Sequence, residues 1–136
     1  MAALAAPRAT PRRDGVTFAR PVAAAALIYQ GSLVCLLATG YATPGAVSTT
    51  LVADGLAKDT VDNSDGAAGD LIVEVERGVF CFENSAAADA ITIAEIGDNC
   101  YIVDDQTVAK TSGSATRSVA GKIEDVDAQG VWVRIG

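Results

Sequence analysis

The chain has 136 residues, a length that suits one domain, and it is half hydrophobic but only 5% aromatic, which favours thin strands with many turns over a thick helical core. It contains no histidine, which excludes His-based catalytic triads, histidine-ligated metal sites and histidine pH switches. The formal net charge is −7, and an acidic surface repels phosphate backbones, so the composition argues against a nucleic-acid partner.

The first twenty residues differ in charge from the rest of the chain. Residues 1–20 contain four arginines and one aspartate, a balance of +3, whereas residues 21–136 contain 6 basic and 16 acidic residues, a balance of −10. Residues 1–15 also contain two prolines and no periodic apolar pattern. We therefore expect an extended basic arm over residues 1–15, suited to an acidic protein surface, and a single β-rich domain over residues 16–136.

A long uncharged segment follows the arm. The 33 residues from Pro21 to Ala53 carry no charge, a feature shared with membrane helices and signal-peptide cores. Turn-forming residues interrupt the segment at Gln30-Gly31-Ser32, and a signal peptide would need an unusually long charged region before it. We therefore expect an alanine-rich approach segment before the turn and a strand over Ser32–Leu37. We expect no membrane partner.

Alternation of apolar and polar residues predicts a series of short strands separated by turns rich in glycine, proline and aspartate. Besides Ser32–Leu37, the expected strands are Val16–Arg20, Tyr41–Thr43, Thr50–Ala57, Leu71–Glu76, Val79–Phe82, Cys100–Val103, Thr107–Ala109, Val119–Val126 and Val131–Ile135. The last two form the clearest hairpin, and Arg77-Gly78 is expected to turn the chain so that Val79–Phe82 pairs with the strand before it. Lys58–Asp70 is expected to be a polar loop.

Helix is scarce in the pattern. Thr92 is an expected N-cap, with a carboxylate three residues later at Glu95 and a terminating glycine at Gly97. The sequence thus predicts a mainly β fold, a small antiparallel barrel or sandwich with one short helix and an extended N-terminal arm.

The three cysteines, Cys35, Cys81 and Cys100, lie far apart in the chain and form no Cys-x-x-Cys motif. Their spacing does not match a zinc site, and a disulfide framework would leave one thiol over. We expect buried, reduced thiols on strands, as in a chain made in a reducing cytosol.

The acidic residues do not form a recognisable catalytic or metal site. Aligning Gly66 with the turn glycine of an EF-hand loop places Asn63 and Asp65 at ligand positions but leaves the apolar residues Val61 and Ile72 at the first and the final ligand positions. Glu74 and Glu76 lie on one face of one strand, whereas paired catalytic carboxylates stand across a cleft. Phosphate-binding glycine motifs and activated nucleophiles are also missing from the sequence. We expect no catalytic residue, metal, cofactor or small-molecule substrate.

From about Gly31 onward the chain resembles the capsid decoration, or cement, proteins of tailed bacteriophages, particularly those of Mu-like prophages. The likeness lies in the order and spacing of three segments, VDNSDGAAGDLIVEVERGVFCFENS, ITIAEIGDNCYIVDDQTVAK and AGKIEDVDAQGVWVRIG. It covers roughly three quarters of the chain.

The resemblance implies a non-enzymatic protein that binds the outer surface of a phage head as a homotrimer, with the major capsid protein as its partner. It also implies a small lambda-type β fold, a place on the capsid exterior of the virion, and synthesis in the host bacterial cytoplasm. The expected capsid-binding residues are Arg8, Arg12, Arg13, Phe18 and Arg20. The expected trimer-interface residues are Phe80, Phe82 and Trp132. Phe80 and Phe82 share one face of their strand and Val79 and Cys81 the other, and apolar side chains on both faces indicate burial or contact between copies.

A different class of function remains open from the residues alone. The same β-rich body could be a binding module of a phage tail, fibre or secreted surface protein that recognises carbohydrate or protein. An array of exposed aromatic residues or a cleaved leader would favour this alternative.

Overall fold

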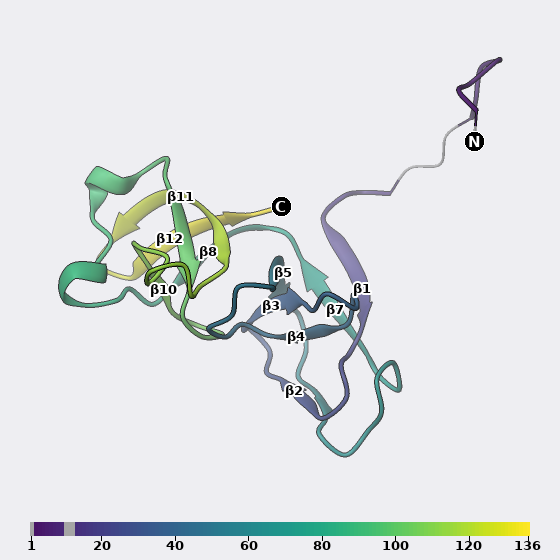
Figure 1. Cartoon of the computed structure of the whole chain (residues 1–136), viewed down its shortest axis with the longest axis horizontal. Helices are drawn as coiled ribbons and strands as arrows, with labels where there is room; N and C mark the ends of the chain where they lie inside the picture. The colour runs from purple at the N-terminus through teal and green to yellow at the C-terminus, as the bar shows by residue number, and fades with distance from the viewer. Residues whose placement is uncertain (1, 10–12) are drawn as a thin grey trace.

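The computed structural model describes residues 2–9 and 13–136. It is mainly β, with 45% of the residues in strands and 5% in helical turns, and its sheets are antiparallel. The described residues form no closed barrel. Figure 1 shows two groups of strands side by side, with residues 2–9 extending away from them.

The first sheet has five strands in the spatial order β1-β7-β5-β3-β4. Their bounds are β1 Thr17–Pro21, β3 Leu33–Leu36, β4 Ala42–Pro44, β5 Val52–Ala57 and β7 Ile72–Glu76. The first strand therefore lies at an edge of this sheet, where it pairs with β7 along its whole length.

The second sheet also has five strands, in the order β10-β9-β11-β12-β8. Their bounds are β8 Gly78–Phe82, β9 Asn99–Ile102, β10 Val108–Ala109, β11 Val119–Asp127 and β12 Gly130–Ile135. The expected C-terminal hairpin is present as β11 and β12. Its alternation is confirmed, because Val131, Val133 and Ile135 are all buried.

A two-stranded pair, β2 (Ala26–Ile28) with β6 (Val61–Asn63), was missed by the sequence reasoning. β2 lies in the alanine-rich approach and β6 in the segment that was expected to be a polar loop. Each strand has only three residues, which is too short for apolar alternation to stand out. Their pairing is between segments more than thirty residues apart, which local sequence patterns do not reveal.

Two hydrophobic clusters occupy opposite faces of the first sheet. Leu33 and Cys35 of β3 join residues of the second sheet in the larger cluster, while Val34 between them joins β2 and β7 in the smaller one. The alternation along β3 thus explains why this strand is apolar on both faces: it is covered on both sides.

The hairpin predicted across Arg77-Gly78 is wrong. β7 ends at Glu76 and β8 begins at Gly78, which leaves one residue between them, whereas a tight hairpin needs at least two. The chain instead passes through Arg77 from the first sheet into the second, and β8 pairs with β12. Arg77 therefore stands at the corner between the two sheets.

The uncharged segment from Pro21 to Ala53 contains β2, β3 and β4. Within the described residues, no helix has the length and apolar character needed to span a membrane.

The helical turns are two 3-10 elements, η1 (Ala87–Asp89) and η2 (Ile93–Glu95). The N-cap expected at Thr92 is confirmed, because its side chain accepts a hydrogen bond from the Ala94 N–H and Glu95 completes a capping box.

The thiol prediction is correct for two cysteines and wrong for the third. Cys35 and Cys100 are buried, and burial raises the pKa of each thiol to about 12. Cys81 lies on the outward face of β8 and is exposed. All three are free thiols.

Candidate functional site: the base of the N-terminal arm

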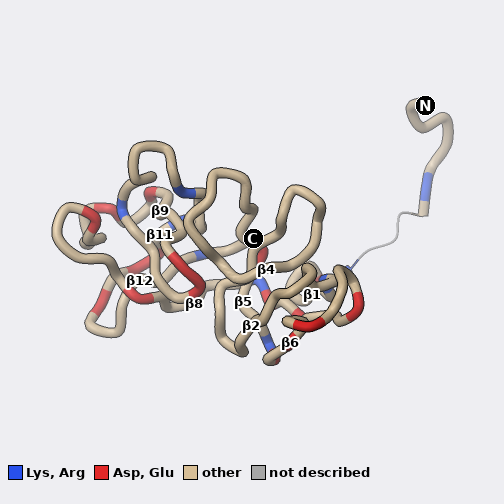
Figure 2. The backbone as a smooth tube through the Cα atoms, turned by 60° about the horizontal axis from the view of Figure 1, so that its bottom comes forward, with Lys and Arg blue, Asp and Glu red and all other residues tan. Residues whose placement is uncertain are grey.

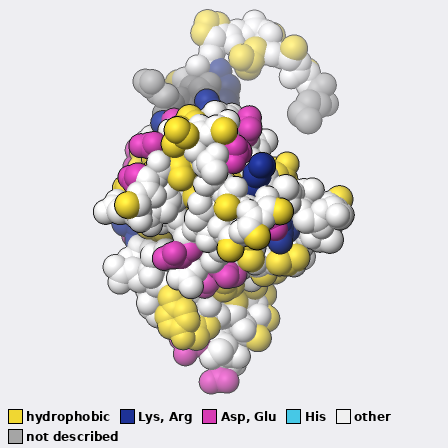
Figure 3. Space-filling model, turned by 90° about the vertical axis from the view of Figure 1, so that its left-hand side faces the viewer, with side chains coloured by type: hydrophobic (Ala, Val, Ile, Leu, Met, Phe, Trp, Pro, Cys, Tyr) yellow, Lys and Arg dark blue, Asp and Glu magenta, His cyan; other side chains and the backbone are white. Residues whose placement is uncertain are grey.

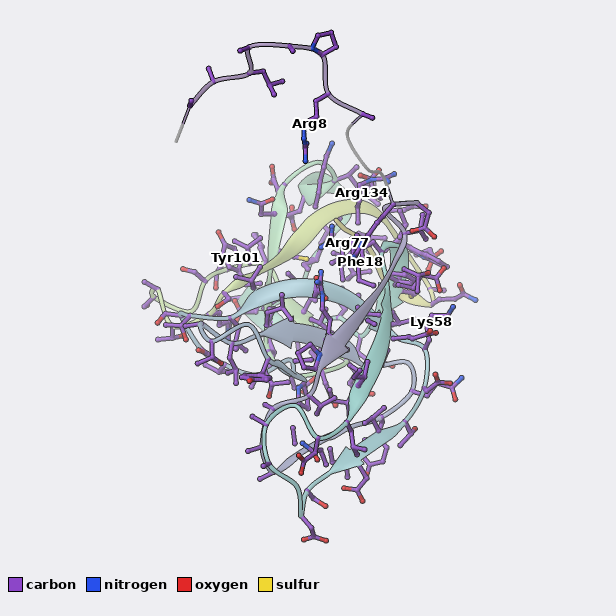
Figure 4. The ribbon with its side chains drawn as sticks, turned by 90° about the vertical axis from the view of Figure 1, so that its right-hand side faces the viewer. Arg8, Phe18, Lys58, Arg77, Tyr101 and Arg134 are labelled. Atoms are coloured by element: carbon purple, nitrogen blue, oxygen red, sulfur yellow. The ribbon has the colours of Figure 1, made fainter. Side chains whose placement is uncertain are left out.

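The N-terminal residues that the structure describes extend outward from the β body. Residues 2–9 are all exposed, as are Arg13 and Asp14, and Figure 4 shows Arg8 on the arm, above the strands. Arg12 lies outside the described residues. The acidic residues are distributed over both groups of strands, as the red positions along the backbone in Figure 2 show, so basic residues on the arm contrast with an acidic body.

A local turn marks the point where the arm meets the body. The Asp14 carboxylate accepts hydrogen bonds from the backbone N–H groups of Val16, at 3.0 Å, and Thr17, at 3.3 Å. These two bonds lower the pKa of Asp14, and the carboxylate fixes the direction in which β1 begins. The backbone carbonyl of Val16 then accepts a hydrogen bond from the N–H of Arg77, at 2.7 Å.

Arg20 of β1 pairs with a buried carboxylate of β5, which lies two strands away in the same sheet. Its Nε and Nη2 donate to the two oxygens of Asp54, at 2.7 and 3.1 Å, in a bidentate pair. Asp54 is only 2% exposed. It is the extra residue of a β-bulge in β5, because Val34 pairs with Gly55 and Cys35 with Ala53, which leaves Asp54 without a partner in β3.

A second arginine reaches the same carboxylate. Arg77, at the corner between the sheets, donates from Nη2 to Asp54 Oδ1 at 3.1 Å. The Cζ atoms of Arg77 and Arg20 lie 4.3 and 4.8 Å from the centre of the Phe18 ring, within the range of cation–π attraction. Phe18 and Arg77 stand close together in Figure 4. We refer to Phe18, Arg20, Asp54 and Arg77 as the arm-base cluster.

Two opposing effects act on the ionisation of Asp54. Burial alone would raise the pKa of this carboxyl, but hydrogen bonds and charge attraction from Arg20 and Arg77 outweigh burial, so the pKa is lowered. The hydrogen bond to Asp54 likewise raises the pKa of Arg20. The cluster therefore holds one negative and two positive charges at neutral pH.

This arrangement anchors the arm rather than extending it. Phe18 and Arg20, expected as capsid-binding residues, lie on β1, where they contact Asp54 and Arg77 of the same chain. Neither side chain is fully exposed. Of the five expected capsid-binding residues, Arg8 and Arg13 are placed on the exposed arm.

The expected trimer-interface residues are not brought together on one surface. Phe82 is 4% exposed and belongs to the larger hydrophobic cluster, against which Phe80 also packs. Trp132 lies on the other face of the same sheet, paired with Cys81 across β8 and β12. Its indole N–H donates to Asp127 at 2.9 Å. Figure 3 shows the side of the molecule that carries this sheet, where hydrophobic side chains lie in several groups among acidic ones.

The acidic loop after β6 uses its polar side chains for its own structure. Asn63 is buried, and its amide donates to the carbonyls of Ala23 and Ala67, at 2.9 and 3.0 Å. The Asp70 carboxylate accepts from the Ala67 N–H at 2.9 Å. Among the residues that the structure describes, no group of three or more cysteine, aspartate or glutamate side chains is arranged to hold a metal ion.

Sequence reasoning missed the roles of Asp54 and Arg77. A signal was present, because Asp54 is a single charged residue inside an apolar strand, and such a residue needs a partner of opposite charge when buried. Which arginines supply that partner depends on the bulge in β5 and on the corner at Arg77. Comparison with known proteins adds no further assignment, since no family model, curated protein sequence or solved structure matches the chain.

Proposed function

We propose that this protein is a non-enzymatic decoration protein of a tailed-phage head, which binds the outer capsid surface and stabilises the shell. The observation that carries the proposal is the contrast between an exposed basic arm and an acidic β body, joined through the arm-base cluster. The resemblance of the chain from Gly31 onward to phage decoration proteins points in the same direction. Two sheets that share one hydrophobic core are consistent with a sandwich of the lambda type.

The proposed mechanism is stabilisation by mass action. A protein that binds the assembled shell and not its separate subunits lowers the free energy of the shell by its binding free energy. An arm that is extended before docking loses conformational entropy when it binds, but it can cover a wide surface. We assign this docking role to the arm arginines Arg8, Arg12 and Arg13. The arm-base cluster connects the arm to both sheets through the bonds of Asp54 with Arg20 and Arg77.

The proposal includes a homotrimer on the shell, because three weak contacts presented together bind far more strongly than one. Burial of Phe82 leaves the outward face of β8 and β12, with Trp132 and Cys81, as the better candidate for contacts between copies.

The proposal is tested by mixing the full-length protein with undecorated shells assembled from the major capsid protein of the same genome. Saturable binding in multiples of three per local three-fold axis, with shells that resist heat or low ionic strength better than undecorated ones, supports the proposal. Absence of binding to expanded and unexpanded shells alike would reject it. Multi-angle light scattering of the free protein across concentrations measures the trimer separately.

A further inference from the structure

A hollow of about 540 Å³ lies between the start of β5 in the first sheet and the start of β11 in the second. Its lining comes from residues 49–53 and 117–120. Val52 and Val119 contribute apolar side chains that are 62% and 43% exposed. The hollow is therefore an open site with apolar walls at the junction of the two sheets.

A buried serine holds the two sides of the hollow together. The Ser118 hydroxyl donates to the Ser48 carbonyl at 2.6 Å and accepts a hydrogen bond from the Leu51 N–H at 3.2 Å. Ser118 is only 8% exposed. The segment that leads into β5 is thus fastened to β11, and the hollow is already formed in the single chain.

Within the described part of the chain, both strands have an edge without a strand partner where they line the hollow. β5 pairs with β3 over its first residues, but it pairs with β7 only from Leu56 onward. β11 likewise pairs with β9 from its first residue, but with β12 only from Lys122 onward. The Leu51 N–H is directed at Ser118, so the unpaired edge of β5 faces β11. Unpaired strand edges bind extended segments through backbone hydrogen bonds.

The side chains of the hollow favour an uncharged segment. Arg117 is the charged residue of the lining, and its Nη1 already donates to the Asp89 carboxylate at 3.3 Å and to the Thr111 carbonyl at 3.1 Å. A charged side chain inserted here would lose water without gaining an unpaired opposite charge. Apolar side chains would instead cover Val52 and Val119.

The arm contains a segment of this kind. Residues 2–7 read AALAAP and carry no charge. Among the described residues outside the β body, Leu4 is the one large apolar side chain, and it is 75% exposed. Small alanine side chains allow close approach to a strand edge, and Pro7, which has no N–H, would end the pairing.

The direction and length of the arm indicate a second copy as the source of this segment. Residues 2–9 are exposed and extend away from their own body (Figure 1). Residues 2–15 can span at most about 50 Å, which exceeds the width of a compact domain of this size, about 35 Å. We infer that residues 2–7 of one copy add as a strand in the hollow of a second copy, where Leu4 contacts Val52 and Val119.

Such a contact is head-to-tail, because the inserted segment and the hollow are different surfaces of the chain. Head-to-tail contacts close into rings when the rotation between copies allows it. The inference does not rest on capsid binding, since it concerns only contacts between copies of this chain.

Sedimentation equilibrium of the full-length protein tests the inference without shells, so its result is separate from the proposed capsid binding. Leu4→Asp and Val52→Lys should each weaken the association constant by about tenfold or more, because each places a charge in an apolar contact. The matched control Ile72→Lys changes an apolar side chain of nearly the same exposure, 63%, on β7 outside the hollow, and should leave association unchanged. A chain that stays monomeric at all concentrations, or equal association of all four proteins, would overturn the inference.

A mixed sample identifies the source of the segment and leaves the acceptor chain unmodified. Unlabelled protein with Cys81→Ser and Ala3→Cys, carrying a nitroxide at position 3, is mixed with ¹⁵N-labelled wild-type protein. We expect selective broadening of the amide signals of residues 51–53 and 118–121 in the labelled copies. Broadening of these signals only when the nitroxide and ¹⁵N are in the same chain would show that the arm folds back on its own body. No broadening there in either sample would show that the hollow does not take the arm, and each of these two results contradicts the inference.

Discussion

The guanidinium of Arg77 lies with its Cζ 4.3 Å from the centre of the Phe18 ring. Phe18 belongs to the first strand and Arg77 to the corner between the sheets, so this contact joins the start of the body to the point where the chain changes sheet. Asp54 completes the connection by accepting hydrogen bonds from both Arg77 and Arg20. The base of the arm is therefore tied to both sheets.

The substitution Asp54→Asn should destabilise the protein by about 2 kcal/mol. Removing the partner of a fully buried ion pair costs about 3–5 kcal/mol, and the cost is smaller here because the Arg20 and Arg77 side chains are 24% and 35% exposed. Urea unfolding measures the change. The control Glu74→Gln removes an exposed carboxylate 3.9 Å from Lys58 and should change the free energy of unfolding by less than about 0.5 kcal/mol. Similar losses in both variants would contradict the assigned role of Asp54.

The arm-base cluster should make part of the stability dependent on acidic pH. Because the pKa of Asp54 is lower in the folded chain than its ordinary value of 3.8, the stabilising contribution is complete above that value and is lost as the pH falls through the folded pKa. We expect the free energy of unfolding of the wild-type protein to fall more steeply between about pH 4 and pH 2 than that of Asp54→Asn. If the free energies of unfolding of the two proteins fall in parallel with pH, the pKa of Asp54 is the same in the folded and the unfolded chain.

Phe18→Leu tests the ring contacts separately from the ion pairs. Leucine keeps an apolar side chain on β1 but removes the aromatic face under Arg20 and Arg77. Each cation–π contact at a partly exposed site contributes about 0.5–1 kcal/mol, so we expect a loss of about 1 kcal/mol in thermal or urea unfolding. If Phe18→Leu is as stable as the wild type, the two arginines are held by Asp54 alone.

Thiol reactivity should distinguish Cys81 from the other two cysteines. Partial burial and the charges of Asp127 and Glu83 raise the pKa of Cys81 as well, but this thiol is exposed. Cys35 and Cys100 are buried with a pKa of about 12, and the thiolate is the reactive form. A disulfide reagent at pH 8 should modify one thiol per chain quickly and the others only after unfolding. Cys81→Ser should remove the fast phase; a fast phase that remains in this variant would contradict the placement of the buried pair.

Strands with clear apolar alternation could be predicted from the sequence. Val73 and Val75, between exposed or half-buried neighbours, mark β7, and Val131, Val133 and Ile135 mark β12. The pairing partners were harder to predict, because they are set by contacts distant in the sequence. The continuation of the chain through Arg77 into the second sheet is an example.

The bulge at Asp54 shows why residue faces also escape local reasoning. Strict alternation from Leu51 and Ala53 predicts that Gly55 shares their face, but the extra residue shifts the phase, and Leu56 packs with them instead. The same shift leaves Asp54 available to Arg20. The candidate site thus depends on a β-bulge, which a prediction from regular alternation cannot anticipate.

The most direct test of the account is to delete residues 1–15 and measure binding to undecorated shells at low and high salt. The deletion removes no core residue and leaves the arm-base cluster complete. It does remove Asp14 and the two exposed hydrogen bonds that its carboxylate accepts at the start of β1, so we expect only a small change in the free energy of unfolding. Each arginine that meets an acidic partner contributes about 0.2–1 kcal/mol, and three arms of a trimer together could lose several kcal/mol of binding.

We therefore expect the truncated protein to occupy far fewer sites than the full-length chain at low salt, with the difference narrowing at high salt as the arginine contacts are screened. Equal occupancy by the folded truncated protein and the full-length chain at both salt concentrations would contradict the central claim that the basic arm docks the protein on the capsid.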